Sequence, residues 1–431
     1  MKTISTTLHR SKFLRVFCVL FLLLVGGQSF ATKLLIPMDN SQRDHLKAYG
    51  IAFWTLQQDL PIDWLLNYRG GSFLIDHYVT LEQECTIRGV TYQVIADGQA
   101  ALILQEISDP EVNMEAVKLE KVPKIAVYAP ESFQPWDDAV TMVMTYAEIP
   151  YERIYDKEII GGVLPQFDWL HLHHEDFTGQ YGKFYRTYRN APWYIENVRE
   201  SEEMAGGLGF AKVSEMKLAV ALRIRDYVSG GGYLFTMCSG TDSYDIALSA
   251  EGVDICAPEF DHDPIDPQAQ QKINFDKAFA FKDFKLIADP MVYEFSDIDA
   301  TDIHSRIGQE RDFFTLFDFS AKWDVVPTML CQSHEQVIRG FMGQTTAFRG
   351  NLVKTGVTVM GENKAQSTVK YIHGEFGLGQ WTFYGGHDPE DYQHMVGDPP
   401  TDLSLHPNSA GYRLILNNIL FPAARKKKQK T

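Results

Sequence analysis

Cysteine is scarce in this chain: 5 of its 431 residues are cysteines, and no two of them stand at Cys-x-x-Cys spacing. That absence disfavours a structural zinc knot and a thioredoxin-type redox motif. Positive charge is also in deficit, with 40 Lys and Arg residues against 56 Asp and Glu residues and a formal net charge of −16. Such a surface repels phosphate groups, so we expect no nucleic-acid partner.

Long apolar runs are missing as well. The uninterrupted run Val16–Val25 is too short to cross a bilayer. It follows a basic region and precedes small residues, and Ser29-Phe30-Ala31 fits a small-x-small cleavage site. We therefore expect residues 1–31 to be a secretory signal peptide, with an uncleaved N-terminal anchor as the alternative. Export predicts a periplasmic or extracellular protein with no transmembrane span once the signal is removed.

An oxidising compartment changes how the cysteines are interpreted. Four remain after the expected cleavage, namely Cys85, Cys238, Cys256 and Cys331. They can pair in three ways, and the sequence does not choose among them. A nucleophilic cysteine among them must escape disulfide formation.

The remaining chain divides into segments of different pattern. We expect a smaller N-terminal α/β unit at 32–121, a core at 122–256 and 346–421, an irregular insertion at 257–345 and a basic tail at 422–431. In the core, apolar runs such as 124–128 and 233–237 alternate with helix-like segments. This alternation predicts an α/β fold with a doubly wound parallel sheet that is covered on both faces.

The strongest chemical signal follows one of these strands. A glycine turn leads into Tyr233–Met237, the strand ends at Cys238, and a helix follows at once. Strand, tight turn, nucleophile and helix is how hydrolases expose a reactive side chain, and a helix N-terminus favours a thiolate. The alternative is a small buried cysteine at a βα turn.

A second strand, Trp381–Tyr384, ends close to His387, Asp388 and Glu390. A cysteine, a histidine and a carboxylate at strand ends are the parts of a Cys-His-acid triad. We expect Cys238 as nucleophile, His387 as base, and Asp388 or Glu390 as the orienting acid. Backbone N–H groups around Ser239 would then hold the oxyanion.

These motifs resemble the class I glutamine amidotransferase-like superfamily. Cys238 and Gly240 match its Gly-x-Cys-x-Gly turn, except that Thr236 replaces the first glycine. His387 and Glu390 match its His-Pro-Glu motif, with Asp388 inserted. The resemblance covers residues 124–252 and 374–390, and it implies a flavodoxin-like sheet.

The whole chain also resembles a family of exported proteins commonly labelled asparagine synthetase B. The stretches that carry this resemblance are 171–182 and 230–248. The residues do not support synthetase activity, because no cysteine stands near the expected mature start. Ser239-Gly240-Thr241-Asp242-Ser243 is also one residue too short for the phosphate loop of a true synthetase.

A dense cluster of metal-ligand types begins at His171. On a strand, His171 and His173 point to the same side, and with Asp176 they would suit zinc or another divalent ion. Alternatively, these strand-end residues hydrogen-bond neighbouring loops. A third interpretation makes His171, His173, Glu175 and Ser239 contacts for a bound substrate.

Three functions are compatible with this sequence. The first is a Cys-His-acid hydrolase or amidase acting on an extracytoplasmic substrate, either a small molecule or an envelope component. The second is a non-enzymatic binding or scaffold module of the envelope with a degenerate site, and the third is a metal-dependent hydrolase. Apart from a divalent metal, no cofactor is expected. Substrate and oligomeric state remain open.

Overall fold

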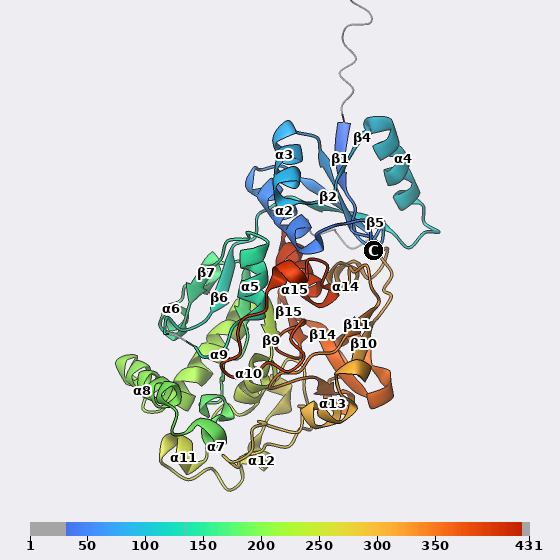
Figure 1. The fold of residues 1–431 in the computed structure, drawn as a ribbon. Helices are drawn as coiled ribbons and strands as arrows, with labels where there is room; N and C mark the ends of the chain where they lie inside the picture. The colour runs from blue at the N-terminus through green and yellow to red at the C-terminus, as the bar shows by residue number, and fades with distance from the viewer. Residues whose placement is uncertain (1–31, 133, 425–431) are drawn as a thin grey trace, which may run out of the picture.

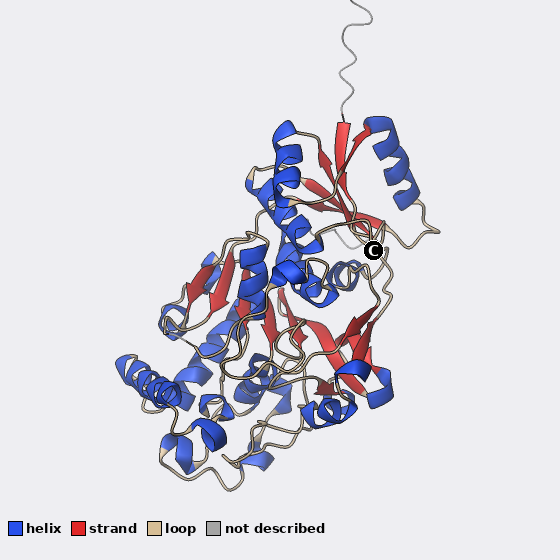
Figure 2. Cartoon of the chain, viewed as in Figure 1, coloured by secondary structure: helices blue, strands red, loops and turns tan. Residues whose placement is uncertain are grey.

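The computed structural model describes residues 32–132 and 134–424 of the chain. The expected signal peptide, residues 1–31, lies outside them, as does most of the expected basic tail. Within the described residues, no helix has the length and apolar character needed to cross a membrane. Helices and strands mix along the chain, which confirms the α/β class (Figure 2).

A small antiparallel sheet forms the N-terminal part of the fold (Figure 1). Its strand order is β4-β1-β3-β2-β5. Apolar residues alternate between its two faces, so Leu34 packs in one core and Leu35 in another. Its elements are β1 (Thr32–Ile36), α2 (His45–Gln57), β2 (Ile62–Leu66), β3 (Ser72–Asp76), α3 (Val79–Arg88), β4 (Gln93–Ala96), α4 (Asp97–Ser108) and β5 (Glu115–Leu119).

A second, larger sheet has the order β11-β10-β13-β14-β15-β9-β8-β6-β7, with β12 also paired to β14. The expectation of a parallel sheet is correct for one half only. The five strands β7, β6, β8, β9 and β15 run parallel, whereas β14, β13, β10 and β11 pair antiparallel. The strands are β6 (Ile125–Tyr128), β7 (Glu152–Ile154), β8 (Trp169–Leu172), β9 (Tyr233–Met237), β10 (Phe313–Leu316), β11 (Val337–Arg339), β12 (Phe348–Arg349), β13 (Thr358–Asn363), β14 (Thr368–Phe376) and β15 (Gly379–Tyr384).

Helices cover both faces of the parallel half. In β6, Ile125 and Val127 face a core shared with α5 and α15, whereas Ala126 and Tyr128 face a core shared with α6, α9 and α10. The helices are α5 (Ala139–Tyr146), α6 (Asp156–Ile160), α7 (Tyr185–Tyr188), α8 (Pro192–Gly207), α9 (Val213–Ser229), α10 (Ser239–Ser249), α11 (Pro258–Asp261), α12 (Ala269–Lys272), α13 (Thr301–Ile307), α14 (Val325–Leu330) and α15 (Ala410–Leu420).

The C-terminal helix α15 joins the two sheets. It packs against α2 of the small unit and α5 of the large one (Figure 1). Its fully buried Arg413 donates hydrogen bonds to the carbonyls of Met38 and Gly70 and to the Tyr49 hydroxyl. The chain then returns to β5, where Leu119 and Ala424 form a β-bridge.

The segment expected to be an irregular insertion contributes to the large sheet, because β10 and β11 both lie within it. Its earlier part is held against α10 by one buried carboxylate. Asp245 accepts hydrogen bonds of 2.7 Å, 2.7 Å and 3.0 Å from the backbone N–H groups of Phe279, Ala280 and Phe281. This part of the segment between β9 and β15 is therefore held against the helix that follows β9.

Candidate active site

Cys238 occupies the sharp turn between β9 and α10. Its backbone angles, φ +49° and ψ −141°, lie in a region that residues with a side chain rarely adopt. The turn is also tight against β8, because a Cβ on Gly240 would lie 2.5 Å from the His173 carbonyl oxygen. A strained strand-to-helix turn of this kind is how a nucleophile is held at the end of a sheet.

Two loops surround the sulfur. The backbone N–H of Gln344 donates a 3.4 Å hydrogen bond to Cys238 Sγ. Cys238 itself donates its N–H to the Gly386 carbonyl at 3.2 Å. The His387 N–H in turn bonds the Met342 carbonyl at 2.9 Å, which ties the two loops together. The sulfur therefore faces a polar backbone donor although the residue is only 3% exposed.

Parallel pairing brings the second sequence motif to the same place. Tyr384 at the end of β15 lies opposite Met237 at the end of β9. Both strands therefore end at one edge of the sheet, where Cys238 and His387 line the same cavity. The two strand ends that the sequence analysis linked are thus side by side.

An aspartate from a third strand end contacts the histidine. His387 Nε2 lies 3.2 Å from Asp137 Oδ1, and His394 Nε2 lies 3.3 Å from the same oxygen. Burial and the neighbouring His173 oppose a charge on His387. Hydrogen bonds with Asp137 and Cys238 outweigh them, so the pKa of His387 is raised above its ordinary value. Burial raises the pKa of Asp137, but its bond to His387 and the adjacent histidines lower it overall.

The acids expected to orient this histidine have other partners. Asp388 is fully buried and accepts hydrogen bonds from the Thr401 hydroxyl at 2.7 Å and from the Glu390 backbone N–H at 2.9 Å. The Glu390 carboxylate lies 3.1 Å from His406. Asp388 therefore stabilises its own turn, and Asp137 replaces both residues as the carboxylate beside His387.

His171 and His173 point to the same side of β8, as alternation along a strand requires. Asp138 meets both, with oxygens 3.3 Å from His171 Nε2 and 3.2 Å from His173 Nδ1. The same carboxylate caps α5 by accepting from two backbone N–H groups of its first turn. Burial raises the pKa of Asp138, but the two histidines hold it well below its ordinary range.

The third acid of the expected metal set lies elsewhere. Asp176 accepts hydrogen bonds from the Thr178 N–H at 2.6 Å, the Thr178 hydroxyl at 2.5 Å and the Gly182 N–H at 3.1 Å. It is a turn-forming residue, and Asp138 occupies the position beside His171 and His173 that was expected for it. The carboxylate that lies beside His171 and His173 is therefore that of Asp138, and the expected grouping of these histidines with Asp176 is wrong.

The two other residues expected to contact a substrate are both buried. Glu175 is 9% exposed, and its Oε1 lies 3.9 Å from His174 Nε2. Burial raises the pKa of Glu175 to about 7, although the nearby Lys217 opposes this. Ser239 begins α10 and is fully buried, with no hydrogen-bond partner for its hydroxyl oxygen among the described atoms.

A cavity of about 470 Å³ opens at this edge of the sheet. Cys238, His174 and His387 lie on its wall together with aromatic residues, methionines and two cations. Trp136 stacks on Phe184 with ring centroids 5.1 Å apart, which fixes one side. The remaining lining residues are Lys183, Arg186, Thr187, Tyr188, Tyr293, Thr301, Met342, Gly343, Gln344, Gln393, His394, Met395 and Val396.

Several residues of this site escaped the sequence analysis. Asp137 and Asp138 had a weak signal, because they open the helix after a buried strand at the same sheet edge. His174 directly follows His173, so alternation along a strand does not place it with His171 and His173. His394 and Asp391, which pair at 2.9 Å, carried no motif at all.

Comparisons with known proteins do not place the chain in a family. No family model and no curated protein matches it. Among solved structures, it is similar to the cytoplasmic proteins STM3548 and STM1381 of Salmonella typhimurium, at 9% and 11% identity. Each match covers 70% of this chain and 100% of the other, with a TM-score of 0.34.

Part of a GH42 β-galactosidase, Gan42B, is similar at 12% identity and a TM-score of 0.26. That match covers 62% of this chain and 28% of the enzyme. None of these structures is similar enough to indicate an activity.

Proposed function

We propose that this protein is a hydrolase or amidase in which Cys238, His387 and Asp137 form a Cys-His-Asp triad. The observation that carries the proposal is the strained turn at Cys238, on a cavity wall it shares with His387. Backbone strain of this kind persists where the surrounding structure enforces it, and it is concentrated at active sites. Asp137 completes the set at 3.2 Å from the imidazole.

Each group has a defined task in this scheme. The Cys238 thiol gives its proton to His387, and the sulfur attacks the substrate carbonyl to form a C–S bond. His387 Nε2 is bonded to Asp137, so Nδ1 is the nitrogen left to serve the sulfur. The C–N bond then breaks as His387 returns the proton to the leaving amine. Water hydrolyses the thioester and restores the thiol.

The backbone N–H of Gln344 is a better candidate for stabilising the oxyanion than the N–H groups of Gly240 and Thr241 in α10. The Gly240 N–H donates to the His173 carbonyl at 2.7 Å, and the Thr241 N–H donates to the Cys238 carbonyl at 3.2 Å. Those two donors are therefore occupied. The Gln344 N–H already faces the sulfur, and together with the Ser239 N–H it would stabilise the developing negative charge.

The strand order supports the amidotransferase-like interpretation. The parallel half of the large sheet, numbered along the chain, has the order 2-1-3-4-5, which is the flavodoxin-like order. In such sheets ligands bind outside the carboxyl ends of the strands, where Cys238 and His387 lie. Because the sequence resembles class I glutamine amidotransferases, we expect the substrate to carry a carboxamide group. Because the N-terminal sequence resembles a signal peptide, we expect that substrate to lie outside the cytoplasm.

Two measurements test the triad. The folded protein is treated with iodoacetamide, and alkylation of each cysteine is followed by mass spectrometry. We expect Cys238 to react at least about tenfold faster than Cys256, whose buried thiol donates to the Thr178 carbonyl. Ammonia release from a panel of small carboxamides, L-glutamine first, then reports turnover.

Matched variants separate the triad from its alternatives. Cys238→Ala and Cys238→Ser should abolish ammonia release, whereas Cys256→Ser should leave it unchanged. Retained turnover in both Cys238 variants would eliminate the mechanism. A Cys238 thiol that is inert in the folded protein would favour the non-enzymatic scaffold instead.

A further inference from the structure

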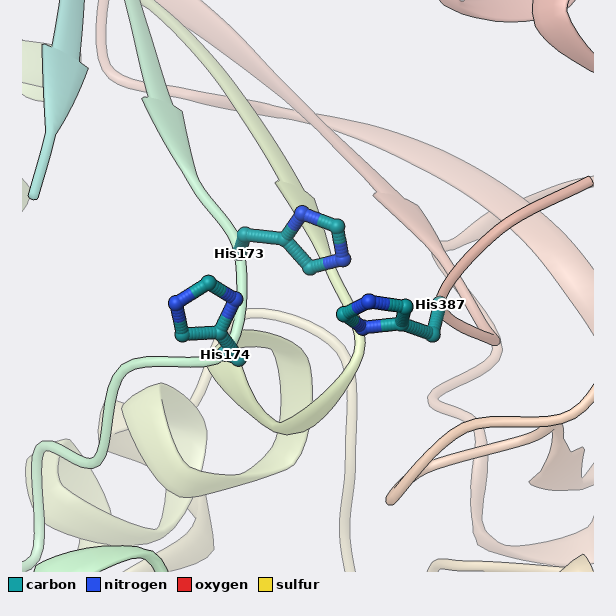
Figure 3. A group of neighbouring side chains, drawn as sticks. All are labelled: His173, His174 and His387. Atoms are coloured by element: carbon teal, nitrogen blue, oxygen red, sulfur yellow. The ribbon is translucent and has the colours of Figure 1, made fainter. Parts of the chain in front are cut away.

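Three histidines converge beside Cys238 although they come from distant parts of the chain. His173 and His174 follow β8, and His387 follows β15 (Figure 3). Their ring centroids are 5.0 Å apart for His173 and His174, 4.5 Å for His173 and His387, and 6.1 Å for His174 and His387. One nitrogen from each lies within 4.8 Å of the others.

Ring nitrogens of this cluster lack hydrogen-bond partners among residues 32–132 and 134–424. His173 Nε2 and His174 Nδ1 are buried and make no hydrogen bond to the described residues. His173 is 1% exposed, so bulk water does not compensate for it. A buried polar atom without a partner costs free energy, and imidazole nitrogens that face a common point are suited to share a metal ion.

Two of the three imidazole rings have a carboxylate beside one of their nitrogens. Asp138 lies 3.2 Å from His173 Nδ1, and Asp137 lies 3.2 Å from His387 Nε2. Each contact places a carboxylate beside one ring nitrogen and leaves the other nitrogen of that ring, Nε2 of His173 and Nδ1 of His387, without one. A carboxylate behind a histidine is the usual support for a metal-bound imidazole, because it fixes the tautomer and the ring orientation.

Asp138 and His171, which lie next to His173 and could also bind a metal ion, have structural roles instead. Asp138 could join His171 and His173 around an ion, but it already caps α5. His171 is fully buried, and its Nδ1 lies 3.2 Å from the Phe235 carbonyl. Both residues are thus committed to holding the strand end, whereas His174 and His387 also reach the cavity wall.

We propose that His173, His174 and His387 bind one divalent transition-metal ion, of the class that prefers imidazole ligands, with Zn²⁺ as the ion to test. Three protein ligands leave a coordination position open toward the cavity. An ion bound to His387 would withdraw this imidazole from accepting the Cys238 proton. The metal-bound form is therefore unable to use Cys238 as a nucleophile, and zinc inhibits the hydrolase activity. This consequence, unlike metal binding itself, rests on the proposed triad.

Binding is measured first, because it does not depend on any activity. The purified chain is stripped with a chelator, dialysed and titrated with ZnCl₂ by calorimetry, with metal content checked by mass spectrometry. We expect one equivalent of Zn²⁺ in the wild type and in Cys238→Ala. His174→Gln should bind at least about tenfold more weakly, because it removes one of three ligands from the cavity wall. His77→Gln, a control in the small unit, should bind like the wild type.

A wild type that takes up no Zn²⁺, or a His174→Gln variant that binds as tightly as the wild type, would overturn the site. Because a histidine variant can misfold, the visible spectrum of Co²⁺ bound to the wild type provides a second test that needs no variant. Co²⁺ should give the visible spectrum of a nitrogen-ligated tetrahedral ion, and a spectrum of hexaaqua Co²⁺ contradicts the site.

The link to the triad has its own readout. Saturating Zn²⁺ should slow iodoacetamide alkylation of Cys238 at least about tenfold, and EDTA should restore it. Stoichiometric Zn²⁺ uptake by a protein whose metal-free form has an inert Cys238 thiol and no carboxamide turnover upholds the metal site and rejects the triad. A reactive Cys238 with no Zn²⁺ uptake upholds the triad and rejects the metal site.

Discussion

Replacing Gly240 with alanine tests whether the turn at Cys238 is as tight as the structure indicates. In most helices this substitution stabilises a protein by about 1 kcal/mol. Here the new methyl would lie 2.5 Å from the His173 carbonyl oxygen and 2.8 Å from Thr236 Oγ1. Neither neighbour can move freely, because one is backbone and the other is a fully buried side chain of β9.

The expected cost follows from these contacts. Overpacking a buried site costs about 1–3 kcal/mol. Displacing His173 also breaks the 2.7 Å bond from the Gly240 N–H, which is worth about 1 kcal/mol. After the gain in helix propensity, Gly240→Ala should lower the free energy of unfolding by about 1–3 kcal/mol.

Urea denaturation followed by tryptophan fluorescence measures this change. Gly206→Ala is the matched control, because Gly206 lies in α8 with no atom within 4 Å of its would-be Cβ. That variant should be as stable as the wild type or more stable by up to about 1 kcal/mol. A Gly240→Ala protein that unfolds at or above the wild-type urea midpoint would refute the packing described for the turn.

Two further predictions concern buried charges. Burial raises the pKa of Asp242 to about 7, although a bond from Thr345 opposes this. A carboxyl whose folded pKa is raised adds stability that is complete below pH 4 and is lost as pH rises to about 7. Relative to Asp242→Asn, the wild type should therefore lose about 4 kcal/mol of unfolding free energy over that range in urea titrations, and a constant difference would contradict the shift. Arg413→Met should lower the free energy of unfolding by about 3 kcal/mol, because the Met38 and Gly70 carbonyls lose a charged hydrogen-bond donor. Thermal or urea unfolding measures this change. An unchanged unfolding midpoint would show that α15 does not depend on Arg413 to join the two sheets.

The parallel half of the large sheet could be predicted because its signals are local. The expected strand before Cys238 coincides with β9, Tyr233–Met237. Residues that follow parallel strands meet at one edge, so proximity of Cys238 to His387 was a reasonable expectation. Alternation along β8 likewise places His171 and His173 on one side.

The acid of the proposed triad could not be predicted, because it depends on a contact between residues 250 positions apart. Sequence proximity favoured Asp388 and Glu390, but a short turn uses Asp388 for its own backbone. The direction of the strands in the other half of the large sheet could not be predicted from the sequence either. An apolar run such as β14 has the same pattern whether it pairs parallel or antiparallel, and its direction is set by the turns on either side of it, which reverse the chain toward β13 and toward β15.

The wide separation of β9 and β15 in the chain has a consequence for biogenesis. All of residues 238–378, which include β10 to β14 of the same sheet, must be synthesised before β15 can pair with β9. Closing so large a loop is entropically costly, and contacts of this range form late. The nascent protein therefore lacks the contacts of Cys238 with Gln344 and Gly386 until β15 and the residues after it have been synthesised. Any chaperone or redox partner that guards this cysteine has to act within that interval.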